Sequence, residues 1–364
     1  MKRLTLGDVC KKASSNIAQK DLQDKIGAYP IYGASGLIKQ VDFYQQDKEY
    51  IAVVKDGAGI GRTMLLPAYS SVIGTMQYLL PKEGIPIDIK YLFYAVEHMN
   101  LAKYFSGATI PHIYFKDYQK EPINIPDIDT QRKISRIFDK IDALIISRKE
   151  QRTRLDQIVK SRFIEMFGDP VDNPHGFRKV ALSELAEIRI GPFGSLLHKE
   201  DYIEGGHPLL NPSHIVDGKV APDSKLTISD KKYDELEAYH LHTGDVVMGR
   251  RGEMGRCAVV PSEGFLCGTG SLLIRTKGEV TADYIQKTIS FPSFRKTIED
   301  MAVGQTMPNL NVPIVSKFQI IKPPIEVQIN YYKFVAQTDK SKYRQEKCIG
   351  FFQCLEKSIR QEWL

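Results

Sequence analysis

Two sets of basic, amide, hydroxyl and aromatic side chains lie in loops that are rich in glycine and proline. The first set comprises Tyr32, Ser35, Lys55, Arg62, Thr109, His112, Tyr114 and Lys116. The second set comprises Lys199, Asn211, Ser213, His214, Arg250, Arg251, Arg256, Gln305, Thr306 and Asn309. Arginine and lysine neutralise phosphates or bind guanine, whereas asparagine and glutamine pair with adenine. A solvated loop explains any one of these residues alone, but their occurrence as two sets favours DNA recognition.

The glycine-rich segment Asp56–Arg62 has the outline of a dinucleotide-binding loop. A strand pattern over Thr63–Leu66 follows it, whereas a nucleotide-binding loop opens a helix. The sequence contains no phosphate-binding loop, nucleophile elbow, adenosylmethionine loop or clamp of the kind that base-methylating enzymes use. His240 and His242 form an H-x-H pair without a third ligand nearby. The sequence therefore predicts a chain with no active site, metal site or bound cofactor of its own.

Composition places the chain among ordinary globular proteins. It has 364 residues, a formal net charge of +6 and 42% hydrophobic residues, which is enough for two or three domains. The five cysteines show no C-x-x-C spacing, so free thiols in a reducing compartment are expected. No apolar run approaches the ~18 residues of a membrane span, and no signal peptide opens the chain. The expected location is cytoplasmic.

Short motifs recur in the same order in both halves of the chain. The matching pairs are Leu6–Val9 with Leu182–Leu185, Gly61–Arg62 with Gly255–Arg256, Thr109–Pro111 with Thr306–Pro308, and Gln131 with Gln328. The distance between partners grows along the chain from 176 through 194 to 197 residues. A period this long indicates two copies of a whole domain, the second with about 18 additional residues before Gly255.

Each copy is predicted to end in a long helix. Apolar residues spaced three and four apart predict helices over 130–167, capped by Asp129 and Thr130, and over 326–363. The first would be about 55 Å long, which suits a spacer or a coiled coil. The second has a weaker apolar stripe, which predicts looser packing. Short runs of β-branched and aromatic residues broken by turns predict strands elsewhere, so the expected fold class is α+β.

Four motifs, in this order, resemble those of the specificity subunit of type I restriction–modification systems. They are Lys160–Pro170, Gly191–Ser195, Gly244–Gly255, and Gly304–Thr306 leading toward the second long helix. The first copy departs from the pattern, with Tyr29–Gly36 where the second has its G-P-F-G-S run. The two halves are therefore expected to read different sequences.

The resemblance implies two α/β target-recognition domains, at residues 1–129 and 169–325. Spacer helices at 130–168 and 326–364 would pair antiparallel as a coiled coil. The implied partners are double-stranded DNA with a bipartite, asymmetric target, two modification (methyltransferase) subunits, and restriction (translocase and nuclease) subunits. S-adenosylmethionine, ATP and Mg²⁺ would serve those partner subunits, and this chain would be non-catalytic.

Two other functions remain open at the level of sequence. One is a stand-alone DNA-modifying enzyme, either a methyltransferase or a nuclease, against which the missing motifs count. The other is a duplicated coiled-coil scaffold that joins proteins and does not bind DNA; salt-dependent DNA binding would distinguish it from a DNA reader.

Overall fold

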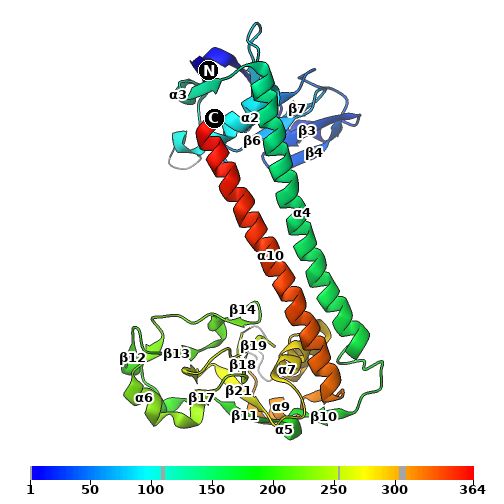
Figure 1. The fold of residues 1–364 in the computed structure, drawn as a ribbon, viewed down its shortest axis with the longest axis vertical. Coiled ribbons are helices and arrows are strands. Elements are labelled where there is room, and N and C mark those ends of the chain that lie inside the picture. Colours follow the sequence, from blue (N-terminus) through cyan, green and yellow to red (C-terminus); the bar gives the residue numbers. More distant parts are fainter. Residues whose placement is uncertain (1, 108–110, 253–254, 303–308) are drawn as a thin grey trace. The chain divides into compact units, whose positions relative to one another are not determined.

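The computed structural model describes residues 2–107, 111–252, 255–302 and 309–364 (Figure 1). The chain forms two compact units. Unit 1 contains residues 1–152 and 344–364, and unit 2 contains residues 153–343. Each unit therefore contains one globular repeat and parts of both long helices, which is a different grouping from the four sequential segments expected from the sequence.

Unit 1 builds its repeat from short strands and helices. They are β1 (Lys2–Thr5), α1 (Leu6–Val9), β2 (Cys10–Ser14), η1 (Gln19–Leu22), β3 (Tyr29–Gly33), β4 (Gly36–Val41), β5 (Tyr50–Val54), β6 (Thr63–Leu66), β7 (Ser71–Val72), β8 (Met76–Pro81), α2 (Ile89–His98), η2 (Leu101–Tyr104), α3 (Phe115–Tyr118) and β9 (Pro122–Ile125).

Unit 2 contains the corresponding series with additions. It comprises β10 (Lys179–Ala181), α5 (Leu182–Leu185), β11 (Ala186–Ile190), η3 (Gly194–Leu196), η4 (Lys199–Asp201), β12 (Tyr202–Ile203), β13 (His207–Leu210), η5 (Pro212–His214), β14 (Ile215–Val216), β15 (Lys219–Val220), β16 (Thr227–Ile228), α6 (Asp230–Glu235), η6 (Glu237–Tyr239), β17 (His240–Leu241), β18 (Val246–Gly249), β19 (Cys257–Val259), β20 (Phe265–Cys267), β21 (Ser271–Thr276), α7 (Ala282–Ile289), α8 (Pro292–Met301), α9 (Val312–Ser316) and β22 (Gln319–Ile321).

The sheet topology confirms the predicted duplication. The main sheet has the order β2-β8-β5-β6 in unit 1 and β11-β21-β18-β19 in unit 2, and its neighbouring strands are antiparallel in both. A second sheet in each unit contains one parallel pair, β3 with β7 and β13 with β20. The additional residues of the second repeat lie between β13 and β18, where they form β14, β15, β16, α6 and β17.

Two buried glutamines make equivalent hydrogen bonds in the two units. Gln131 Nε2 donates to the Pro126 carbonyl at 2.9 Å, and its Oε1 accepts from the Asp88 backbone N–H at 2.8 Å. Gln328 Nε2 donates to the Pro323 carbonyl at 2.9 Å, and its Oε1 accepts from the Thr281 N–H at 2.9 Å. The sequence match between these glutamines thus reflects one structural role, which is to fix the start of a long helix against the capping residue of another helix, α2 (Ile89–His98) in unit 1 and α7 (Ala282–Ile289) in unit 2.

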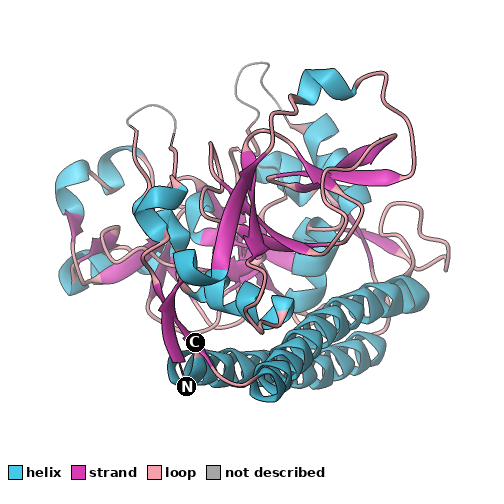
Figure 2. Ribbon diagram, turned by 90° about the horizontal axis from the view of Figure 1, so that it is seen from above, coloured by secondary structure: helices cyan, strands magenta, loops and turns pink. Residues whose placement is uncertain are grey.

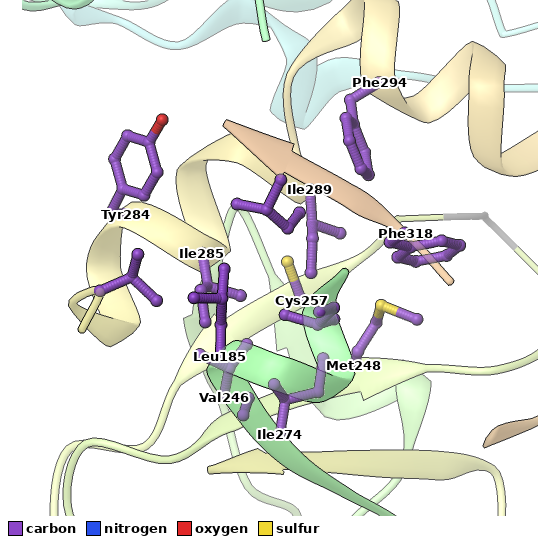
Figure 3. Packing of buried hydrophobic residues seen from close by; sticks show 14 of the residues in the cluster. Leu185, Val246, Met248, Cys257, Ile274, Tyr284, Ile285, Ile289, Phe294 and Phe318 are labelled. Carbon is purple, nitrogen blue, oxygen red and sulfur yellow. The ribbon is translucent and has the colours of Figure 1, made fainter. Parts of the chain in front are cut away.

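One amphipathic helix covers the main sheet in each unit. In unit 2, Tyr284, Ile285 and Ile289 of α7 pack with Val246 and other buried residues of the sheet (Figure 3). The Thr281 hydroxyl caps this helix by accepting from the Tyr284 N–H. In unit 1, α2 occupies the corresponding place and is capped by Asp88. Burial of these apolar faces stabilises both repeats.

The two long helices are α4 (Ile128–Phe167) and α10 (Ile325–Trp363), drawn green and red in Figure 1 and as the long cyan helices in Figure 2. Both confirm the predicted helices to within two residues. The predicted cap of α4 was wrong: the Asp127 carboxylate accepts from the Thr130 N–H at 2.9 Å, so Asp127 is the cap. Asp127, Asp129 and Thr130 all have side chains that can cap a helix. The helix begins directly after Asp127, so Asp127 takes the capping position.

The long helices pack antiparallel inside each unit. In unit 1, Arg148 of α4 donates to Gln345 of α10 at 3.2 Å, and Arg360 lies over the Phe138 ring at 5.1 Å. In unit 2, Asp156 pairs with Lys342 at 2.7 Å. As the α4 residue number rises, the number of its α10 partner falls, which defines the antiparallel direction.

The end of α10 packs more firmly than its weak apolar stripe predicted. Ile359, Trp363 and Leu364 pack against the buried core of unit 1. The Trp363 carbonyl also accepts a hydrogen bond from the Tyr91 hydroxyl at 3.1 Å. The apolar periodicity of one helix does not reveal which residues, far away in the sequence, pack against it. Of the helices formed by described residues, none has both the length and the apolar character to span a membrane.

Candidate nucleic-acid interface

One hairpin of the main sheet holds candidate residues in each unit. In unit 1 it connects β5 to β6, and its first loop residue is Lys55. The Lys55 N–H donates to the Thr75 carbonyl at 3.0 Å, and the Lys55 carbonyl accepts from the Ile113 N–H at 3.0 Å. These bonds tie the hairpin to the turn between β7 and β8 and to the segment that follows η2. Because they use only backbone groups, they place the loop without restricting its side chains.

The hairpin of unit 2, between β18 and β19, is held in the same way. The Arg250 N–H donates to the Gly270 carbonyl at 3.0 Å, and the Arg250 carbonyl accepts from the Leu310 N–H at 2.9 Å. An isolated β-bridge joins Arg251 to Asn309, just as one joins Asp56 to His112 in unit 1. The two loops are therefore structural equivalents that present different side chains.

In unit 1 the loop and the facing segment form a small polar and aromatic surface. The His112 ring contacts the Asp56 carboxylate, and its centroid lies 4.2 Å from that of Tyr114. The Lys116 amine is 5.2 Å from the centre of the Tyr114 ring. Asp56, His112 and Tyr114 are among the residues that line a hollow of about 630 Å³. The structure thus brings together Lys55, His112, Tyr114 and Lys116, which are four of the predicted DNA-binding residues.

The protonation state of His112 decides what this surface offers. Partial burial of the ring and the nearby Lys55 amine lower the pKa of His112 below its ordinary range. The shift favours the neutral ring over the charged ring in the folded chain. If Nδ1 carries the hydrogen and donates to Asp56, then Nε2 is an acceptor. The carboxylate and the ring nitrogen then form an acceptor-rich group beside the Lys55 amine.

The other candidates of unit 1 lie apart from this surface or outside the described residues. Arg62 Nη1 donates to the Ala34 carbonyl at 3.0 Å, which places the arginine beside the exposed Ser35 in the turn between β3 and β4. Tyr32 is half-buried and packs against the cluster that contains Tyr50. Thr109 lies outside the described residues.

In unit 2 the arginines and asparagines converge on one surface of the hairpin. Arg250 Nε donates to Asn309 Oδ1 at 3.1 Å, and Arg251 is exposed beside them. Arg256 Nη1 donates to the Pro212 carbonyl at 3.3 Å, and Asn211 Oδ1 accepts from the Gly270 N–H at 3.3 Å. Partial burial and the neighbouring Arg251 lower the pKa of Arg250, but a guanidinium remains charged. This surface is rich in hydrogen-bond donors.

The remaining candidates of unit 2 differ in their access to solvent. Lys199 in η4 and Ser213 in η5 are exposed, and Ser213 lies two residues from Asn211. His214 is only 5% exposed, and its Nδ1 lies 2.8 Å from the Leu209 carbonyl. Its burial therefore argues against the DNA contact that its place in a Gly/Pro-rich loop predicts. Gln305 and Thr306 lie outside the described residues.

Asp56 belongs to the surface of unit 1 but was not among the predicted site residues. Its carboxylate holds His112, and it lines the same hollow. A signal for it existed in the sequence: Asp56 occupies the position of Arg251, since both precede a glycine in the repeated hairpin. Acidic side chains are not expected on a DNA-binding surface, because they repel phosphates, so residue type alone does not indicate Asp56. In the described part of the chain, no group of three potential metal ligands comes together.

Comparisons with known proteins give the family. The family described as "Type I restriction modification DNA specificity domain" matches residues 1–157 and 174–348. The specificity subunit of the type I restriction enzyme MjaVIII of Methanocaldococcus jannaschii is 20% identical over 299 residues, which cover 76% of this chain and 69% of that subunit. The EcoprrI specificity subunit of Escherichia coli is 28% identical over 149 residues, 39% of this chain and 36% of that subunit.

Solved structures share the fold over nearly the whole chain. The S subunit of a type I system from M. genitalium matches with a TM-score of 0.58 at 14% identity, covering 100% of this chain and 96% of that one. A second match is a chain from a structure that describes the assembly and conformational transition of a type I restriction–modification system. Its TM-score is 0.66 at 15% identity, and the match covers 99% of this chain and 96% of the other chain. These matches support the duplicated α+β fold with two long helices.

The duplicated α+β fold with two long helices is the fold that these solved structures share. The chain belongs to the type I restriction–modification DNA specificity family, because the family match covers more than half of its residues. It is the DNA-recognition subunit of such a system and works with the system's other subunits, which carry out the catalysis.

Proposed function

We propose that each unit reads one half of a bipartite, asymmetric target in double-stranded DNA. Unit 1 would use the surface of Lys55, Asp56, His112, Tyr114 and Lys116. Unit 2 would use the surface of Arg250, Arg251, Arg256, Asn211 and Asn309. The observation that carries this proposal is the equivalence of the two hairpins, which have the same backbone hydrogen bonds and different side chains.

The side chains favour different bases in the two halves. A carboxylate such as that of Asp56 accepts from the amino group of cytosine or adenine, whereas an arginine such as Arg251 donates to O6 and N7 of guanine. The amide group of Asn309 suits adenine. Exposed lysines such as Lys116 and Lys199 would neutralise phosphates and set the position of the protein on the duplex.

The helices α4 and α10 would bind two modification subunits, which methylate adenine, and the complex would then recruit restriction subunits. S-adenosylmethionine, ATP and Mg²⁺ would be bound by those partners. The complex would act in the cytoplasm, where the DNA is. A stand-alone enzyme and a scaffold that does not bind DNA are not favoured, because the chain belongs to a DNA-specificity family.

An exchange of one repeat tests this function. Residues 171–325 are replaced by the matching part of a relative that has a different target, and the modification complex is expressed in a host whose methylated sites are then sequenced. One half-site should change and the other should stay the same. If both half-sites change, or neither does, the two units do not read the DNA separately.

A further inference from the structure

Unit 2 contains a cavity of about 870 Å³ beside α7. Its walls come from α7, from the ends of α4 and α10 that belong to this unit, and from the turn between β14 and β15. Helix α7 buries Tyr284, Ile285 and Ile289 toward the sheet (Figure 3). Asp283 and Lys287, one helical turn apart on α7, both line the cavity. Arg256 of the proposed DNA-reading surface also lines this cavity, whereas Arg250, Arg251 and Asn309 do not.

Four lysines, two arginines and four aspartates line this cavity, so its basic side chains outnumber its carboxylates. Lys342 is neutralised by Asp156 at 2.7 Å and by Asp339 at 3.0 Å. Lys287 has no carboxylate within ion-pair distance among the residues that the structure describes. Burial, together with the nearby amines of Lys342 and Lys160, lowers the pKa of Lys287, and the more distant Asp156 carboxylate opposes this shift only in part. A partly buried ammonium that faces two further amines is a position where an anion would bind favourably.

Two more polar groups line the cavity. The Tyr332 hydroxyl is buried and has no hydrogen-bond partner within the described part of the chain. Asp283 is exposed at the edge of the cavity, and its carboxylate forms no ion pair with any described residue. A buried hydroxyl without a partner costs free energy, so native proteins usually satisfy such a group with protein, water or ligand.

The corresponding place in unit 1 has its polar groups paired. Tyr91 and Tyr284 set the correspondence between the helices, because both hydroxyls donate to a carbonyl of the last strand, Asn124 and Ile321 respectively. By this register Lys90 corresponds to Asp283, and Tyr94 corresponds to Lys287.

The pairs in unit 1 are short and specific. Lys90 bonds to Asp139 at 2.6 Å, and the Tyr94 hydroxyl donates to Asp139 at 3.0 Å. The Tyr94 ring lies 4.7 Å from the ring of Phe138, whose equivalent in unit 2, by the match of Gln131 with Gln328, is Val335. Val335 lines the cavity and is much smaller than phenylalanine. The second repeat therefore has open space and unmatched charge where the first has packed rings and ion pairs.

We propose that this cavity binds the phosphoryl group of a small molecule, such as a free nucleotide. Lys287 and Lys160 donate to the phosphate oxygens, and Asp283 and Tyr332 bind the hydroxyl groups of the attached sugar. A phosphoryl group fits better than a carboxylate because it offers several oxygens to more than one amine. A free ligand fits better than the DNA backbone because the Tyr332 hydroxyl is buried and only a small molecule reaches it.

Calorimetry on the purified full-length chain, with AMP and with inorganic pyrophosphate as probes, tests the site. Saturable binding of one molecule per chain is expected. Lys287→Met should weaken it at least ~tenfold through loss of a charge-assisted hydrogen bond. Val335→Phe should weaken it by a similar factor, because it gives this position the residue that unit 1 has. Thermal unfolding of each variant shows whether the fold is kept.

The control is Lys296→Met, which removes an exposed lysine of α8 that does not line the cavity. It should leave the affinity for both probes unchanged. A competition with a short DNA duplex identifies the source of the phosphate: displacement of AMP points to the DNA backbone, and no displacement points to a free ligand. The proposal is overturned if neither probe binds saturably, or if Lys287→Met and Val335→Phe bind as the unaltered chain does.

Discussion

The loop after β5 and the loop after β18 have the same backbone hydrogen bonds and nearly opposite chemistry. Lys55 and Arg250 start the two loops and make equivalent bonds. The next residues are Asp56 in unit 1 and Arg251 in unit 2, which face His112 and Asn309 across equivalent β-bridges. Because backbone groups hold both loops, side chains can change there at little cost in stability. A duplicated protein can in this way acquire two different DNA specificities on one fold.

The largest expected effect comes from giving unit 1 the charge of unit 2. Asp56→Arg removes the carboxylate that holds His112. It also puts a guanidinium, which donates hydrogen bonds, where the proposed contact to the base needs an acceptor. Methylation of the cognate site by the assembled modification complex should fall about 100-fold, which corresponds to about 3 kcal/mol. Binding to unrelated DNA should not weaken, since the change adds positive charge.

The matched control makes the same charge change at an exposed acid of the same unit, Asp24→Arg. Its methylation rate at the cognate site should stay within about twofold of the unaltered complex, since exposed surface changes have small effects. If Asp24→Arg and Asp56→Arg lose activity equally, the effect is one of overall charge, and Asp56 is not a recognition residue.

The comparison of the two repeats can also be tested in their cores. Gln131 and Gln328 are fully buried and make equivalent bonds to a proline carbonyl and a backbone N–H. Replacing either by alanine leaves those groups without a partner, at a cost of about 2 kcal/mol of unfolding free energy. Urea unfolding should show similar losses for the two variants, whereas Gln157→Ala, at an exposed position of α4, should show none. Clearly unequal losses would contradict the structural equivalence.

Removal of one arginine from unit 2 should have a smaller effect on recognition. Arg251 is exposed and bridged to Asn309 through the backbone, so Arg251→Ala keeps the loop in place. A lost base contact costs about 1–2 kcal/mol, roughly tenfold, and relaxes one position of the half-site that unit 2 reads. A lost phosphate contact would instead lower affinity for all sequences and reduce the salt dependence by about one ion.

Methylation mapping and salt titration of the Arg251→Ala complex separate these two outcomes. Lys231→Ala, at an exposed position of α6, is the control and should alter neither the mapped site nor the affinity by more than about twofold. If Arg251→Ala leaves both affinity and salt dependence unchanged, its side chain is solvated surface and does not contact DNA.

Much of the architecture could be predicted because it depends on local signals. The match of Gln131 with Gln328 and the apolar spacing of the long helices are visible in one sequence, and both repeats and both helices were confirmed. The parallel pairing of β3 with β7 could not be predicted, because long-range pairing leaves no local pattern. The packing of Trp363 against the core of unit 1 depends in the same way on residues far away in the sequence.

The candidate site was predicted by residue type, which identified most members and misplaced others. Lys55, His112, Arg250 and Asn309 lie on the hairpin surfaces because equivalent backbone hydrogen bonds and β-bridges place them there. His214 has the right chemistry for DNA but is buried against a carbonyl, and burial of one short turn cannot be judged from composition. Whether the assembled surfaces contact DNA stays a prediction.

The smallest expected effect is a difference in pH dependence between the two half-sites. The pKa of His112 lies below its ordinary value of 6.5, so the neutral ring is favoured in the folded chain and gains a proton only as the pH falls below that value. Protonation converts Nε2 from acceptor to donor and adds a charge beside Lys55. Discrimination against a mismatch in the half-site of unit 1 should therefore fall about threefold between about pH 7.5 and pH 5.5. Discrimination in the half-site of unit 2 should stay constant, because arginine and asparagine do not titrate there.

Equilibrium binding of the assembled complex to matched and mismatched duplexes measures the discrimination in both half-sites. His112→Gln should remove the dependence in unit 1, whereas His98→Gln, at another histidine of the same unit with a lowered pKa, should keep it. If both half-sites respond equally to pH, or if His112→Gln keeps the response, the neutral His112 ring does not take part in reading the DNA.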